Sequence, residues 1–180
     1  MRLYRIASLK DLLNEFEEKD VFKRLSRFVC TRDPDREAFL HNKAIAFEKK
    51  NMARTYLAII DDRSLDISHS PSDVSMPDNQ GVSKSLGKKM NIDPDNNVAQ
   101  SYLLGQLGRA DYSYKGMGAD LLEDAMEIVK QANGLVGCRV VRMDCQNGLI
   151  PYYEQHGFKY LCITDPSKDK PPINQMIQII

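Results

Sequence analysis

The clearest pattern of apolar and polar positions lies in the second half of the chain. In GADLLEDAMEIVKQANG, residues 118–134, apolar side chains recur every three or four positions, which predicts an amphipathic helix ending at Gly134. A short helix over 147–156 follows, with Pro151 near its first turn and Gly157 as its stop. Segments rich in apolar and β-branched residues predict four strands, over 98–109, 138–145, 159–163 and 173–180.

The first half shows two further helical patterns, each preceded by a residue that caps helices well. Ser8 stands directly before LKDLLNEFEEK, residues 9–19, and is expected to be the N-cap of that helix. The second pattern, DREAFLHNKAIAFEKKNM over 35–52, has Asp33 or Asp35 as its cap. Two short strands are predicted as well, over 2–6 and 55–61.

The segment 62–97 differs in composition from the rest of the chain. It is rich in Ser, Pro, Asp, Asn and Gly, which favour turns, and we expect one strand in it, around Leu65 to Met76. The sequence shows neither an internal repeat nor a domain boundary, so we predict one domain over 1–180. Because helices and strands alternate, the predicted fold class is α/β (α+β), a mixed central β-sheet with helices on both faces.

The overall composition is that of a globular protein with a buried core. Of the 180 residues 42% are apolar, and 25 acidic side chains balance 25 basic ones. A net charge of zero gives no general attraction to a phosphate backbone, although it leaves room for a local basic patch. The chain has no apolar run long enough to span a membrane, and its first residues are charged throughout. We therefore expect a cytoplasmic protein with no membrane partner.

The four cysteines do not form a metal-binding or disulfide pattern. They contain no CxxC pair and no histidine cluster lies near them, so neither a zinc site nor a disulfide framework is predicted. We expect reduced, mostly buried thiols and no metal. The cysteines are Cys30, Cys138, Cys145 and Cys162.

The loop between the strand over 98–109 and the helix over 118–134 carries the first chemical signal. Gly116 and Gly118 stand immediately before the helix, so backbone N–H groups can approach an anion closely, and Lys115 adds a positive charge. A tight turn without any ligand would use the same glycines. The loop is neither the dinucleotide fingerprint, because residue 121 is leucine, nor a Walker loop, because no GK followed by Ser or Thr is present.

Two motifs together resemble the GCN5-related N-acetyltransferase (GNAT) family. The acyl-CoA motif of that family, Q/R-x-x-G-x-G/A, matches at Gly116 and Gly118, while Ser113 stands where Gln or Arg is usual. A second family element, N-x-x-A/L-x-x-F-Y-x-x-x-G-F, resembles the segment that carries Asn147, Tyr152, Tyr153, Gly157 and Phe158. The YxxHGF element and the LGQLGR and SYKGMGADLL runs look most like the acetyltransferase toxins of toxin–antitoxin modules.

The resemblance implies a GNAT-like sheet that binds acetyl-CoA as a cosubstrate. The strand before the glycine loop is expected to bulge, so that its backbone grips the pantetheine arm, with the N–H of Leu107 stabilising the tetrahedral oxyanion. Tyr153 is expected to face the groove and to donate a proton to the leaving thiolate, while Tyr152 faces the core. The implied cofactor-binding residues are Leu107, Gly108, Arg109, Ser113, Tyr114, Lys115, Gly116, Met117, Gly118, Ala119, Asn147 and Tyr153.

The implied reaction is direct transfer of the acetyl group to an amine, without an acyl-enzyme. Cys145 is better explained as a packed strand cysteine, and His156 as a residue that favours the C-terminal end of its helix. The base that takes the amine proton stays open between Asp111, Gln106 acting through water, and water alone.

Three functional hypotheses remain open from the sequence. The first is an N-acetyltransferase for a small-molecule or protein amine. The second is a toxin that acetylates aminoacyl-tRNA; a basic face on the N-terminal helices would favour it, although such charges usually form a solvated face. The third is a non-catalytic acyl-CoA-binding module, and we also expect that the apolar closing strand could pair in a homodimer. The basic face would comprise Arg24, Arg27, Arg32, Arg36 and Lys43.

Overall fold

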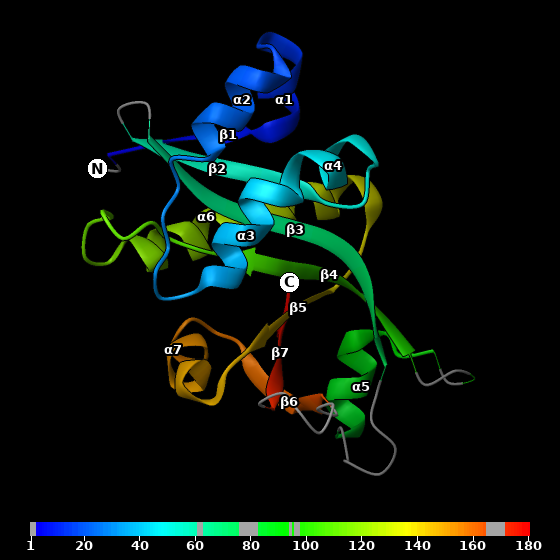
Figure 1. The fold of residues 1–180 in the computed structure, drawn as a ribbon. Coiled ribbons are helices and arrows are strands. Elements are labelled where there is room, and N and C mark those ends of the chain that lie inside the picture. Colours follow the sequence, from blue (N-terminus) through cyan, green and yellow to red (C-terminus); the bar gives the residue numbers. More distant parts are fainter. Residues whose placement is uncertain (1–2, 61–62, 76–82, 94, 96–97, 165–171) are drawn as a thin grey trace. The chain divides into compact units, whose positions relative to one another are not determined.

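The computed structural model describes residues 3–60, 63–75, 83–93, 95, 98–164 and 172–180 (Figure 1). The chain divides into two compact units, of which unit 1 comprises Met1–Ser70 and Gln106–Met126. Unit 2 comprises Pro71–Gly105 and Glu127–Ile180. A single acetyltransferase domain over 1–180 stays a prediction. Within the described ranges, none of the helices has the length and apolar character that crossing a bilayer requires.

Unit 1 contains an antiparallel set of strands in the order β1-β2-β3. Arg5 pairs with Ile59 and Arg54 with His69 in this register. Leu9, Phe28 and Leu57 are among the side chains that form its core, each at most 1% exposed. The strands are β1 (Arg5–Ser8), β2 (Arg54–Ile60) and the first part of β3 (Arg63–Ser75), and the helices are α1 (Leu9–Glu15), α2 (Glu18–Leu25), α3 (Pro34–Asn42), α4 (Ala44–Lys49) and the first part of α6 (Met117–Val136).

Local capping explains where the N-terminal helices begin. The hydroxyl of Ser8 accepts the N–H of Asp11, and a carboxylate oxygen of Asp33 accepts the N–H of Arg36 at 3.2 Å. Both predicted caps are therefore confirmed. The helix predicted over 35–52 is interrupted at Lys43, which has φ −124° and lies between α3 and α4. Likewise the helix predicted over 9–19 ends at Glu15, and α2 begins at Glu18.

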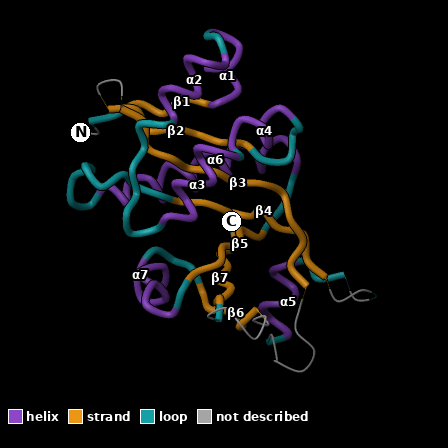
Figure 2. Tube along the Cα trace, viewed as in Figure 1, coloured by secondary structure: helices purple, strands orange, loops and turns teal. Residues whose placement is uncertain are grey.

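Unit 2 contains a mixed set of strands in the order β4-β5-β7-β6, where β4 and β5 run parallel and the other pairs antiparallel. Its elements are α5 (Lys84–Met90), β4 (Val98–Leu107), the rest of α6, β5 (Val140–Cys145), the 3₁₀ turn η1 (Asn147–Leu149), α7 (Ile150–Gln155), β6 (Lys159–Thr164) and β7 (Ile173–Ile179). Figure 2 shows helices beside strands in each unit. The predicted α/β class with a mixed sheet is confirmed.

Helices cover both faces of the strands in unit 2. Met90 of α5 packs in one cluster with Val140 and Ile177. Figure 1 shows α5 and α7 on opposite sides of β7.

Three features of unit 2 differ from the sequence-based expectations. The sequence does not predict α5, which lies in the segment expected to form turns and is capped by the Ser83 hydroxyl. Helix α6 passes through Gly134 and ends at Val136, because the left-handed residue is Gly137, with φ +74°. Strand β7 lies between β5 and β6, so the closing strand has no unpaired edge for a second copy. A homodimer stays a prediction, but pairing through β7 no longer supports it.

Candidate active site

The glycine turn before α6 is open and lies in unit 1. Gly116 has φ +98°, a conformation that favours glycine, and a β-carbon there would meet no atom within 4 Å. The amides of Met117 and Ala119 donate to the carbonyls of Tyr114 and Gly116. Among the described residues, the amides of Gly116 and Gly118 have no hydrogen-bond partner. Two donors at the start of a long helix are thus available to an anion.

Side chains of the same loop hold its shape. Arg109 donates from Nη1 to the hydroxyl of Ser113 at 3.0 Å. The hydroxyl of Tyr114 donates to a carboxylate oxygen of Asp120 at 2.5 Å, and Asp120 lies in the first turn of α6, where negative charge is favourable. Lys115 is exposed and belongs to no ion pair among the described residues. The loop therefore presents two cationic side chains beside the turn.

Strand β4, which leads into this loop, pairs with β5 over only part of its length. β4 pairs with β5 over Ser101–Leu104, and β4 itself continues to Leu107. Backbone groups of its last residues are therefore outside that register. The predicted bulge and the oxyanion role of Leu107 stay predictions.

A segment far away in sequence packs on the loop within unit 1. The N–H of Asp111 donates to the carbonyl of Val29 at 2.9 Å, and the N–H of Thr31 donates to the Asp111 carboxylate at 3.1 Å. Gly108 is buried, and a β-carbon on it would lie 3.2 Å from Cδ of Arg36 and 3.5 Å from Cζ of Phe28. Sequence reasoning missed this segment, because no local pattern links residues 28–36 to the loop.

The bond from Thr31 bears on the search for a general base. Hydrogen bonds from Thr31 lower the pKa of the Asp111 carboxyl, and the charges of Arg32 and Arg109 lower it further. A carboxylate with a lowered pKa is a weaker proton acceptor. Of the three candidates for the base, Asp111 is therefore disfavoured, and Gln106 through water and water alone remain.

Unit 2 contains the tyrosine pair, and the burial of the two rings differs from the expectation. Tyr153 is 4% exposed and packs edge-on against Phe158, with ring centroids 6.0 Å apart, whereas Tyr152 is half-buried. The Tyr152 ring lies 4.5 Å from that of His156, one helical turn later. Tyr153 is thus on the face of α7 that contacts β6 and β7, because neighbours on a helix point about 100° apart.

His156 and Cys145 have structural explanations, as the sequence predicts. Nδ1 of His156 donates to the carbonyl of Tyr152 at 2.7 Å and so satisfies a carbonyl near the end of α7. Burial raises the pKa of the Cys145 thiol, and the neighbouring Asp144 charge raises it further. A thiol with a raised pKa is mostly protonated near neutral pH and a poor nucleophile.

Asn147 stands one residue nearer to the tyrosine pair than the family element has it, five positions before Tyr152 instead of six. Its side-chain oxygen accepts a hydrogen bond from Nδ2 of Asn174 at 2.6 Å, and the same Nδ2 donates to the carbonyl of Cys145. Asn147 therefore joins the end of β5 to β7. Its role in cofactor binding stays a prediction.

The predicted site residues differ in accessibility. Gly108, Met117 and Tyr153 are buried, and Lys115, Gly116 and Asn147 are exposed. The others are half-buried, namely Leu107, Arg109, Ser113, Tyr114, Gly118 and Ala119. All except Asn147 and Tyr153 belong to unit 1. Among the residues with described positions, no cluster of three or more His, Cys, Asp or Glu could hold a metal ion.

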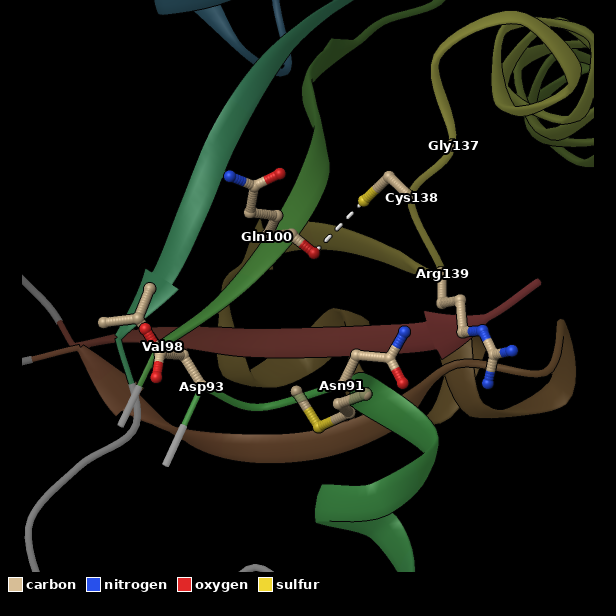
Figure 3. A pocket seen from close by; sticks show the side chains of 8 residues that line it. Asn91, Asp93, Val98, Gln100, Gly137, Cys138 and Arg139 are labelled. Atoms are coloured by element: carbon tan, nitrogen blue, oxygen red, sulfur yellow. Dashed lines mark hydrogen bonds between the residues drawn. The ribbon is translucent and has the colours of Figure 1, made fainter. Parts of the chain in front are cut away.

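Unit 2 also has a pocket of about 570 Å³ that none of the predicted site residues lines (Figure 3). Val98 and Gln100 contribute to it from the start of β4, and Arg139 stands directly before β5. The Cys138 thiol donates to the carbonyl of Gln100 at 3.1 Å. Within unit 2, η1 with Asn147 follows the opposite, C-terminal end of β5.

Comparison with known proteins gives a fold but no match by sequence: no protein-family model and no curated protein matches the chain. A solved bacterial toxin matches with a TM-score of 0.73 at 18% identity, over 99% of this chain and 92% of that one. A tyrosine-to-phenylalanine mutant of KacT matches with a TM-score of 0.72 at 19% identity, over 99% and 95%. The structural neighbours KacT and AtaT are toxin acetyltransferases of the GNAT fold.

This chain has the GNAT fold. AtaT complexed with acetyl-methionyl-tRNAfMet also matches, with a TM-score of 0.70 at 21% identity, over 95% of this chain and 93% of that one. In the GNAT fold of this chain, the motif glycines Gly116 and Gly118 begin α6, and Tyr153 lies on α7. The order of elements predicted from the sequence for residues 98–180 is thereby confirmed.

Proposed function

We propose that this protein is an acetyl-CoA-dependent N-acetyltransferase. The observation that carries the proposal is the open turn at the start of α6, where the amides of Gly116 and Gly118 have no partner among the described residues. An oriented pair of N–H groups at a helix N-terminus suits a diphosphate, which acetyl-CoA contains. The GNAT fold and the match to a structure of AtaTR bound with acetyl-CoA support this ligand.

In the proposed reaction the acceptor amine attacks the carbonyl carbon of the acetyl thioester. The carbon–sulfur bond breaks, the thiolate of CoA takes a proton from the Tyr153 hydroxyl, and the amine loses its proton to water. The N–H of Leu107 stabilises the oxyanion of the tetrahedral intermediate. No metal takes part in this scheme. A tyrosine-to-phenylalanine mutant has been solved for both AtaT and KacT, which supports a role for a tyrosine in these proteins.

For the acceptor, we propose the amino group of an aminoacyl-tRNA ahead of a small-molecule or protein amine. Support comes from AtaT, which is solved with acetyl-methionyl-tRNAfMet. Exposed cations on unit 1 give this chain local sites for phosphates despite its zero net charge. They include Lys23, Arg27 and Arg32. A toxin of this kind would act with an antitoxin partner, as AtaT is solved with AtaR.

The test combines product analysis with one substitution. The purified protein is incubated with acetyl-CoA and either aminoacyl-tRNA or a mixture of amines, and acetylated products are identified by mass spectrometry. Tyr153→Phe should lower kcat about a hundredfold or more while acetyl-CoA binding changes little, because only the proton donor is lost. Acetylated tRNA adducts would support the toxin activity, and acetylated small amines the alternative. Acetyl-CoA binding without any product would leave the non-catalytic module.

A further inference from the structure

Arg109 is the cation nearest in sequence to the glycine turn apart from Lys115, and unlike Lys115 it is half-buried. Its Nη1 donates to the Ser113 hydroxyl at 3.0 Å, three residues before Gly116. That bond uses one of the five N–H donors of the guanidinium. The side chain is therefore held at the loop by a neutral partner.

Arg109 forms no direct ion pair among the described residues, whereas Arg36 pairs with Asp33 and Arg54 with Glu48. The carboxylate of Asp111 is near enough for the charge of Arg109 to lower its pKa, but it is bound by the N–H of Thr31. A guanidinium that no carboxylate binds directly keeps N–H donors for a negatively charged ligand. Planar, forked N–H donors suit the oxygens of a phosphate.

The position of Ser113, which accepts the hydrogen bond from Arg109, indicates which phosphate group Arg109 binds. Ser113 is the first residue of the hexad Ser113 to Gly118, where the motif of the GNAT family has Gln or Arg, so the loop has a short hydroxyl there in place of an amide or a guanidinium. Arg109 is bound to Ser113 itself. The hydrogen bond thus places the guanidinium of Arg109 at position 113, where the chain has a serine and no guanidinium of its own.

We infer that the side chain of Arg109, anchored by Ser113, binds the diphosphate of acetyl-CoA in place of the Gln or Arg that this loop lacks. The inference rests on the proposed function and adds a residue with a separate test. Gly116 and Gly118 then bind the diphosphate with their amides, and Arg109 neutralises its charge.

The first experiment measures the dissociation constant of CoA by isothermal titration. Arg109→Ala should weaken binding about ten- to a hundredfold, because a charge-assisted contact to phosphate is lost. Arg109→Lys should weaken it less, since the charge stays and the fork is lost. Arg5→Ala is the matched control: this exposed arginine lies on β1 and has no part in the proposed site, so binding should stay within about twofold of wild type.

The second experiment moves the cation. The double variant Arg109→Ala, Ser113→Arg places a guanidinium directly at the hexad position and should restore CoA binding to within about threefold of wild type. A purely structural role of Arg109 would not be rescued in this way. Thermal unfolding of each variant checks that the loop still folds.

The outcomes separate the inference from the proposed function. Binding by Arg109→Ala within twofold of wild type overturns the inference, and so does a double variant as weak as Arg109→Ala. If the wild-type chain itself does not bind CoA, the proposed function falls together with the inference. If the wild-type chain binds CoA and Arg109→Ala leaves the dissociation constant unchanged, only the inference is overturned.

Discussion

The side chain of Arg36 lies against the backbone of Gly108, with its Cδ 3.2 Å from the position that a β-carbon on Gly108 would take. Arg36 belongs to α3 and Gly108 follows β4, so two segments distant in sequence meet directly beside the glycine loop. Arg36 is also held by an ion pair with Asp33 at 2.9 Å, and Phe28 on the other side is fully buried. The residue at 108 therefore has little room for a side chain.

Gly108→Ala should lower the free energy of unfolding by about 1–3 kcal/mol, because Arg36 and Phe28 would have to shift. Urea denaturation measures the change. Gly105→Ala is the matched control in the same strand region: no atom lies within 4 Å of its β-carbon position. It should stay within about 0.5 kcal/mol of wild type. Equal effects at the two positions would contradict the packing that the structure shows.

Gly116→Ala should destabilise the protein by about 1–3 kcal/mol, because φ +98° is strained for any residue with a β-carbon, although the space around it is open. The same substitution at Gly134, an exposed position inside α6, should stabilise by up to about 1 kcal/mol, since alanine favours helix. Thermal unfolding of both variants checks the opposite signs. A neutral Gly116→Ala would argue against the left-handed turn.

Glu48→Ala should cost about 3–5 kcal/mol of stability. Glu48 is 4% exposed, and its carboxylate accepts the N–H of Thr55 at 2.9 Å and pairs with Arg54 at 3.0 Å. Its removal leaves the buried N–H of Thr55 without an acceptor and Arg54 without its carboxylate partner. As a control, Glu127→Ala removes an exposed ion pair with Lys130 and should change stability by less than about 1 kcal/mol. Similar losses for the two variants in urea denaturation would contradict this difference.

Asp111→Asn should lower the stability of the fold near neutral pH, and the loss of stability should be smaller in acid. The pKa of Asp111 is lowered by the bonds from Thr31, so the ionised carboxylate stabilises the fold above its ordinary pKa of 3.8. That contribution is lost as the pH falls below 3.8 through the pKa of the folded state. The difference in Tm between wild type and Asp111→Asn should therefore shrink on acidification below that value. A constant difference from pH 7 to pH 3 would contradict the role of the charge.

Much of the fold could be predicted because its signals are local. Helical spacing of apolar residues gave α6, the hydroxyl of Ser8 and the carboxylate of Asp33 gave two helix starts, and Gly116 gave the turn. The sequence-based prediction of helices was wrong where two local conformations have similar energies. Lys43 interrupts a helix whose apolar pattern continues, and α5 forms in a segment whose composition favours turns.

The sequence by itself determined the order of helices and strands, the glycine turn before α6 and the tyrosine pair on α7, because these depend on periodicity, capping and backbone conformations within a few residues. Only the tertiary structure decided that Tyr153 is the buried ring, that residues 28–36 pack on Gly108 and Asp111, and that Arg109 binds Ser113. Such contacts depend on which faces pack together and which charges remain unpaired, and no local pattern in the chain encodes them.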